Sequence, residues 1–135
     1  MRALAIAMLL CATAAAGPPV ASGPVKAYRG PEGEQVAMVE VSDGKQVLVL
    51  MKRIGGPLDG KAVLYELEDL GRGTKNVFVL KKQGSKTFRS HLLVARDNRW
   101  DFIHPTNPKV QFGLTYSQSD SEALRFEDLL KAYTP

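Results

Sequence analysis

Between Glu34 and Tyr116, hydrophobic and polar positions alternate in short runs that are separated by turn residues. Runs of this length, rich in β-branched and aromatic residues, predict β-strands. The predicted strands cover residues 35–41, 45–52, 61–68, 75–82, 86–95, 99–104 and 109–116. About seven short antiparallel strands joined by tight turns predict a mainly β domain, folded as a β-barrel or a β-sandwich.

The first two predicted strands form a hairpin with two apolar faces. Asp43-Gly44 is a strong signal for a two-residue hairpin turn. The turn pairs Val39 with Leu48 and Ala37 with Leu50 on one face, and Met38 with Val49 and Val36 with Met51 on the other. One face can therefore line the core, while the other needs a cover.

One C-terminal amphipathic helix is predicted to be that cover. Ser119 and Glu122 have the spacing of a capping box at the start of a helix. The residues that follow place an apolar stripe on one side, formed by Ala123, Phe126, Leu129, Leu130 and Tyr133. We expect the helix to pack on the sheet and to bury Phe126 and Leu130. Its polar face carries net negative charge, which argues against docking on an anionic membrane.

The N-terminal segment predicts export. Arg2 precedes an apolar run over residues 3–16, and Ala14 and Ala16 occupy the small-residue positions of a signal peptidase site. The run is shorter than the roughly 20 residues that span a bilayer. We predict a cleaved signal peptide over residues 1–22, a flexible Pro/Gly-rich leader over 23–33 and a single β-rich domain over 34–135. Cleavage near Ala16 and near Ser22 are both open.

The only cysteine, Cys11, lies inside this signal. A lipoprotein signal is less consistent with the sequence, because the bulky Leu10 precedes Cys11. The mature chain would contain no cysteine, which excludes disulfides and thiolate sites. We therefore expect a bacterial periplasmic or secreted protein with no transmembrane segment after processing.

Charge suggests an anionic partner, but geometry limits this interpretation. Eight basic residues and one acidic residue lie between Arg72 and Arg99, with aromatic residues among them. This composition is typical of polyanion binding. The predicted turns place Lys81, Lys82 and Lys86 at one end of a hairpin and Arg96 and Arg99 about 35 Å away. They cannot form one compact patch, and charged strand ends also serve to prevent edge-to-edge association. Specific nucleic-acid binding is not expected, because the chain is predicted to be exported and has no recognised nucleic-acid-binding motif.

The two histidines form the second candidate constellation. A turn at Asp97-Asn98 predicts pairing of Ala95 with Trp100 and of His91 with His104. Facing histidines could bind a metal or respond to pH. The metal interpretation lacks a third ligand, because Asp101 falls on the opposite face. A hydrogen-bonded or stacked pair at the margin of the core is the more ordinary interpretation.

Catalytic signatures such as G-x-S-x-G, S-x-x-K and phosphate-binding loops are absent from the sequence. No catalytic residue, cofactor or metal is predicted. We expect a non-catalytic binding or accessory protein of the inhibitor, immunity or complex-subunit type. Its partner would be another exported protein or an anionic surface, and the sequence leaves the oligomeric state open. The alternatives are a small-ligand carrier barrel and a small hydrolase or isomerase that uses the barrel mouth, with His91, His104 and Asp101 as its residues. The binding candidates are Lys81, Lys82, Lys86, His91, Trp100 and His104.

Overall fold

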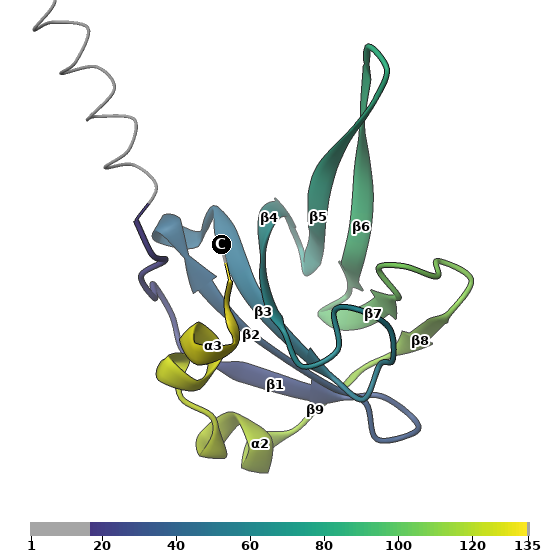
Figure 1. Ribbon diagram of the computed structural model, residues 1–135. Helices are drawn as coiled ribbons and strands as arrows, with labels where there is room; N and C mark the ends of the chain where they lie inside the picture. The colour runs from purple at the N-terminus through teal and green to yellow at the C-terminus, as the bar shows by residue number, and fades with distance from the viewer. Residues whose placement is uncertain (1–16, 135) are drawn as a thin grey trace, which may run out of the picture.

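Nine strands form one antiparallel sheet that curls into a nearly closed barrel (Figure 1). The computed structural model describes residues 17–134. The strands are β1 (Lys26–Arg29), β2 (Gln35–Val41), β3 (Gln46–Lys52), β4 (Ala62–Gly71), β5 (Thr74–Gln83), β6 (Lys86–Arg96), β7 (Arg99–Ile103), β8 (Gln111–Gly113) and β9 (Thr115–Tyr116). A short 3-10 turn, η1 (Ser42–Gly44), joins β2 to β3, and two helices, α2 (Gln118–Ala123) and α3 (Phe126–Ala132), end the chain.

The barrel is closed by β8 and β9, which are the two parts of one interrupted strand. The sheet order is β8-β7-β6-β5-β4-β3-β2-β1-β9, so β8 pairs with β7 at one edge and β9 pairs with β1 at the other. Only Leu114 separates β8 from β9, and its backbone N–H donates to the carbonyl of Trp100 at 2.9 Å. Closure removes most of the exposed strand edges that would otherwise invite association.

The β2–β3 hairpin has the predicted register and the predicted two apolar faces. Val39 pairs with Leu48 and Met38 with Val49. The turn accommodates positive φ angles at Asp43 and Gly44, which suits these two residues. One face contributes to the barrel interior with Phe102, Met51 and Leu93, and the other forms a second core that contains Leu48.

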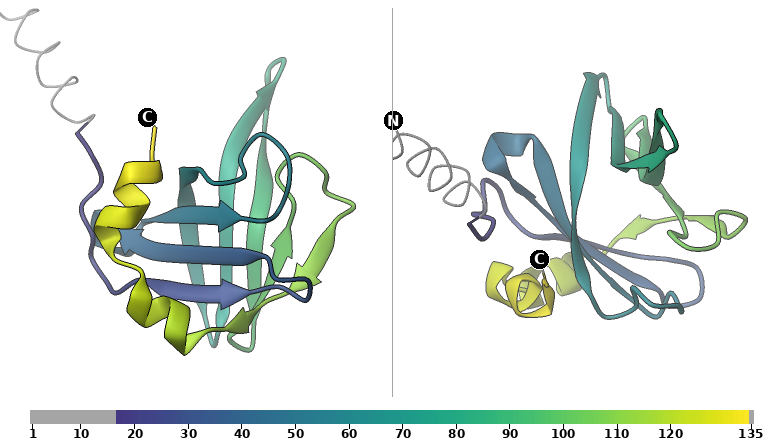
Figure 2. Two further views of the ribbon diagram at one scale, coloured as in Figure 1. Left: turned by 60° about the horizontal axis from the view of Figure 1, so that its bottom comes forward. Right: turned by 45° about the horizontal axis from the view of Figure 1, so that its top comes forward.

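The C-terminal helices cover this second face, as Figure 2 shows from two sides. The prediction of one helix from Ser119 is wrong, because the helix is interrupted at Leu124 and two short helices form. The hydroxyl of Ser117 caps α2 by accepting from the backbone N–H of Asp120. Leu129 is fully buried, whereas the expected Phe126 and Leu130 are partly buried against the same core.

The segment expected to be a flexible leader contributes a strand instead. Lys26–Arg29 forms β1 between β2 and β9, and Ala27 is buried beneath the helices. Proline and glycine are frequent on both sides of β1. The four residues of β1 itself have backbone N–H donors and the alternation of side chains that suits a strand. Together with the break at Leu114, this strand raises the count from seven to nine. The predicted signal sequence over residues 1–16 lies outside the described residues.

None of the helices between residues 17 and 134 is long and apolar enough to cross a membrane.

Candidate binding surface

The most prominent surface feature is the β5–β6 hairpin, which projects from the barrel (Figure 1). Strand β4 pairs with β5 only as far as Phe78, and β7 pairs with β6 only as far as Leu93. Beyond these points the two strands of the hairpin pair only with each other, up to Gln83 and Lys86. The ten residues 80–89 are all exposed. We call them the hairpin tip.

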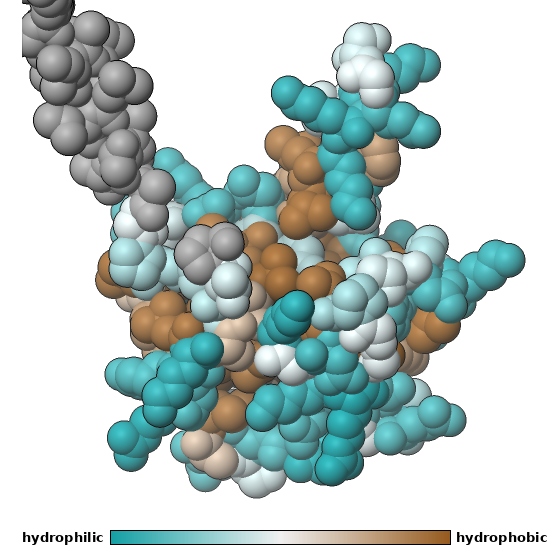
Figure 3. Space-filling view, viewed as in Figure 1, coloured by the Kyte–Doolittle hydropathy of each residue, from teal (hydrophilic) through white to brown (hydrophobic). Residues whose placement is uncertain are grey.

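Two large apolar side chains stand in solvent on the hairpin tip. Leu80 is 60% exposed and Phe88 is 45% exposed. Lys81 pairs directly with Phe88 in the register, and Leu80 pairs with Arg89. Figure 3 shows hydrophobic side chains at the base of the hairpin, with hydrophilic side chains around its end. Exposed apolar groups within a polar border are a frequent property of interaction surfaces.

Three predicted binding residues, Lys81, Lys82 and Lys86, lie together on the hairpin tip. The basic residues do separate into two groups, because Lys86 begins β6 and Arg96 ends it. The tip contains four basic residues and no acidic residue. It therefore presents a small, positively charged surface rather than an extended basic patch.

An ionic network holds the base of the hairpin against β4. The guanidinium of Arg89 lies 4.2 Å from the centroid of the Phe78 ring and 2.9 Å from a carboxylate oxygen of Glu68. Asn76 donates to the same carboxylate at 3.0 Å. The hydrogen bonds from Arg89 and Asn76 lower the pKa of the Glu68 carboxyl. Arg89 is the residue of the hairpin tip that takes part in these contacts, so the network orients the hairpin and leaves residues 80–88 exposed.

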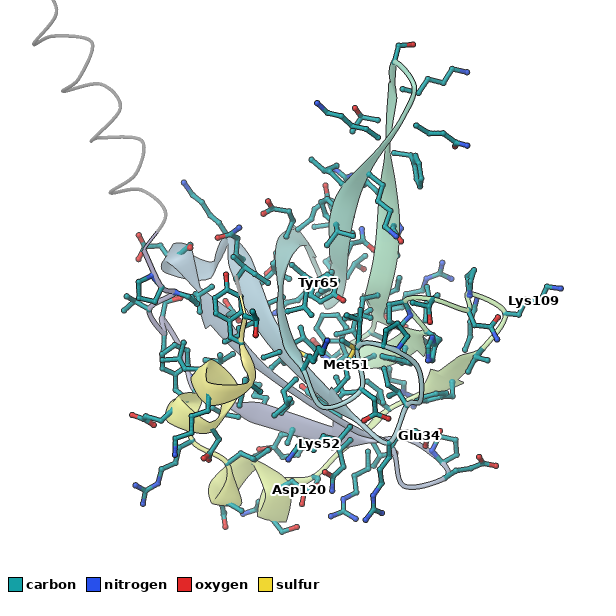
Figure 4. The ribbon with its side chains drawn as sticks, viewed as in Figure 1. Glu34, Met51, Lys52, Tyr65, Lys109 and Asp120 are labelled. Atoms are coloured by element: carbon teal, nitrogen blue, oxygen red, sulfur yellow. The ribbon has the colours of Figure 1, made fainter. Side chains whose placement is uncertain are left out.

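A cleft of about 240 Å³ opens beside the hairpin base, between the strands and two loops. Its lining is largely apolar, with several polar donors and no carboxylate; the residues are Pro57, Leu58, Val63, Tyr65, Val79, Lys81, Ser90, His91, Leu92, Pro105 and Thr106. Figure 4 labels Tyr65, which lies between Met51 and the base of the projecting hairpin. The sequence did not single out Tyr65. The only signal was strand alternation, which places it on the same face as Val63 and Leu67.

The predicted pairing of His91 with His104 is wrong. Strand β6 contains a β-bulge. Leu93 pairs with Val77 and the next pair is His91 with Phe78, so Leu92 is the extra residue. The alternation of β6 is shifted at this point, and the imidazole of His91 lies against the Phe78 ring with centroids 5.8 Å apart. Strand β7 ends at Ile103, before it reaches His104.

His104 instead joins the two loops of the cleft. Its Nδ1 accepts from the backbone N–H of Thr106 at 3.2 Å, so Nδ1 carries no proton. The protonated Nε2 then donates toward the carbonyls of Ile54 at 3.0 Å and Gly55 at 2.9 Å. Gly56 lies against the imidazole with a positive φ of 89°, where a side chain would be strained. Both ring nitrogens are occupied, which assigns His104 a structural role.

Trp100 lies apart from the hairpin tip. It is nearly buried in the barrel core and lines a cavity of about 50 Å³ with Tyr28 and Met38. Burial raises the pKa of the Tyr28 hydroxyl, and a hydrogen bond with Trp100 opposes part of that effect. Of the predicted binding residues, Lys81, Lys82, Lys86 and His91 therefore lie on the hairpin. Trp100 lies in the barrel core, and His104 holds two loops together.

Residues 17–134 contain no group of three histidine, cysteine, aspartate or glutamate side chains that could hold a metal ion. Asp101, a weak catalytic candidate, is exposed on β7 opposite Val94 and Gly113. Comparison with protein-family models, curated proteins and solved structures finds no match for this chain. Its function must therefore be inferred from the geometry and chemistry of the chain itself.

Proposed function

We propose that this chain is an exported, non-catalytic binding protein that recognises another exported macromolecule through the hairpin tip. The observation that carries the proposal is the exposure of Leu80 and Phe88 on the part of β5 and β6 where the two strands pair only with each other among the described strands. A two-stranded ribbon is only marginally stable by itself in water. A partner that covers Leu80 and Phe88 would explain why a ribbon of this kind carries apolar side chains.

The packing of the barrel supports this role over that of a carrier with a hollow interior. Phe102, Leu93 and Met51 fill the space between the barrel walls and are fully buried. A filled interior leaves little room for an apolar ligand inside the barrel. Leu80 is exposed on one face of the hairpin tip and Phe88 on the other, and exposed apolar side chains of this kind favour macromolecular recognition. The cleft at the hairpin base is an open hollow at the margin of this core, because it is lined in part by Tyr65 and Leu92 of the same core cluster.

The positive charge of the hairpin tip indicates which class of partner it can bind. Lys81, Lys82 and Lys86 surround the exposed apolar groups, and the tip carries no acidic side chain. Two copies of the tip would repel each other, while an acidic protein surface would be attracted and oriented. We therefore propose an acidic exported protein as the partner, in an inhibitor, immunity or complex-subunit relationship. No observation favours a hydrolase or isomerase, because both nitrogens of His104 are engaged with the backbone.

The test is affinity capture from a bacterial periplasmic extract with three immobilised baits. They are the wild-type protein, a double variant Leu80→Ser with Phe88→Ser, and a control double variant Leu70→Ser with Val110→Ser. Leu70 is 61% exposed and Val110 is 40% exposed, so the control removes comparable apolar surface elsewhere.

The expected result is an acidic protein that the wild type and the control retain and the hairpin variant loses. Binding of the purified partner should weaken as salt rises, because the interaction involves exposed lysines. Capture that is unaffected by Leu80→Ser with Phe88→Ser would overturn the proposal.

A further inference from the structure

The hydroxyl of Tyr65 is a polar group that the fold does not satisfy. Tyr65 is only 4% exposed, and burial alone raises the pKa of its hydroxyl to about 12. Within residues 17–134, no fully enclosed side-chain polar atom lacks a hydrogen-bond partner. No residue between 17 and 134 forms a hydrogen bond with the Tyr65 hydroxyl, so this hydroxyl must retain access to the cleft that Tyr65 lines. The hydroxyl is therefore available to donate a hydrogen bond to an acceptor that enters the cleft.

The other polar groups of the cleft favour an anion. Lys81, which is positively charged, is one of the lining residues, and Ser90 and Thr106 are lining residues with hydroxyl groups. No aspartate or glutamate lines the cleft, so no internal carboxylate competes for these donors. A carboxylate is an acceptor only, and it makes stronger hydrogen bonds than a neutral acceptor does.

The remainder of the lining favours an apolar body on the same ligand. Leu58, Val63, Val79 and Leu92 supply aliphatic surface, and Pro57 and Pro105 add further apolar surface to the lining. The volume of about 240 Å³ exceeds the roughly 150 Å³ of an apolar protein cavity that binds benzene. The space therefore suits a ligand larger than a single ring, such as a short alkyl chain.

We propose that the cleft is a binding site for a small amphiphilic carboxylate. The carboxylate accepts a hydrogen bond from the Tyr65 hydroxyl and faces the ammonium of Lys81, and the apolar chain lies between Leu92 and the loops. This site shares Lys81 with the proposed macromolecular contact, but Leu80 and Phe88 do not line the cleft and Tyr65 is not part of the hairpin tip. Leu80→Ser with Phe88→Ser therefore tests the macromolecular contact, and Tyr65→Phe tests the cleft.

The test is calorimetric titration of the folded protein with octanoate, and with octanol as the neutral probe. Octanoate should bind saturably to the wild type, and octanol should bind more weakly. Tyr65→Phe and Lys81→Met should each lower the affinity for octanoate by roughly tenfold or more, because each removes an interaction with the charged group. Neither variant should change the weak binding of octanol by a comparable factor.

Lys82→Met is the matched control, since Lys82 is adjacent in sequence but does not line the cleft. Its affinity for octanoate should equal that of the wild type. A melting curve for Tyr65→Phe checks that the variant remains folded. Absence of saturable octanoate binding to the wild type would overturn the proposal. So would unchanged affinity in folded Tyr65→Phe, or equal effects of Lys81→Met and Lys82→Met.

Discussion

At the scale of single residues, His104 shows how one imidazole can fix two loops. It bridges residues 54–55 and 106 through both ring nitrogens, with little exposure to solvent. Replacement by phenylalanine keeps an aromatic ring beside Phe102 but leaves the loop carbonyls and the Thr106 N–H without their partner. We predict that His104→Phe lowers the free energy of unfolding by about 1–3 kcal/mol.

Chemical denaturation measures this loss, and limited proteolysis should show new cleavage within residues 53–61. His91→Phe is the control, because His91 is half-buried against Phe78 and forms no hydrogen bond to the cleft loops. Equal and small effects of the two substitutions would contradict the bridging role of His104.

Leu129 is the second residue whose role can be tested alone. It is fully buried between α3 and the outer face of the sheet, beside Leu48 and Leu50. We predict that Leu129→Ala lowers the free energy of unfolding by about 2–5 kcal/mol, because truncation leaves a cavity in a packed core. Leu130→Ala should cost less, since Leu130 is only partly buried. Denaturant unfolding of both variants decides the order, and a larger loss at Leu130 would contradict this packing.

At the scale of elements, α2 is attached to β1 by polar contacts. The guanidinium of Arg29 lies 2.7 Å from the carboxylate of Asp120, and the hydroxyl of Ser121 accepts from the backbone N–H of Ala27 at 2.8 Å. The hydrogen bond from Arg29 lowers the pKa of the Asp120 carboxyl. Since the folded-state pKa is lowered, the pair stabilises the fold above the ordinary carboxyl pKa of about 4.

That stabilisation is lost as the pH falls through the lower, folded-state pKa. We predict that Asp120→Asn melts at a lower temperature than the wild type at pH 7. The difference between the two should shrink between about pH 4 and pH 2. Thermal melts across this range provide the measurement. A constant difference down to pH 2 would mean that the Asp120 charge contributes nothing to the attachment of α2.

Local patterns in the sequence predicted the hairpins well, because turn residues and alternation act over short distances. The β2–β3 register and the pairing of Ala95 with Trp100 are both confirmed. The bulge at Leu92 could not be predicted, because an extra apolar residue in a strand has no distinctive sequence signal. This bulge is the reason that the predicted position of His91 was wrong. The break at Leu124 was missed for a similar reason, since the apolar periodicity continues through it.

At the scale of the whole molecule, closure of the barrel depends on contacts that no local pattern contains. Strand β9 is only two residues long and pairs with β1, which lies near the other end of the domain sequence. Strand β9 falls within the predicted strand over 109–116, whereas β1 was expected to be a flexible leader, and no local pattern indicated that the two would pair. The lysines of the candidate site were predicted from composition. Tyr65 was not, since its significance comes from the cleft that surrounds it.

The N-terminal segment carries the last prediction, because its described part contacts the domain. Ala21 forms a bridge with Val41, the Ser22 N–H donates to the carbonyl of Glu40 at 2.8 Å, and the Ser22 hydroxyl accepts from the Gly44 N–H. Processing near Ser22 would remove these contacts, whereas processing near Ala16 would keep them. We therefore predict that expression in a bacterial host yields a periplasmic protein that begins near Gly17.

Intact-mass measurement of the periplasmic fraction identifies the first residue. Purified forms beginning at Gly17 and at Gly23 should differ in the free energy of unfolding by roughly 1 kcal/mol, in favour of the longer form, because each hydrogen bond contributes a modest net stabilisation. Equal stability would show that Ala21 and Ser22 add nothing to the fold. Recovery of an intact Met1 form from the cytoplasm would refute export, and with it the proposal of an exported partner.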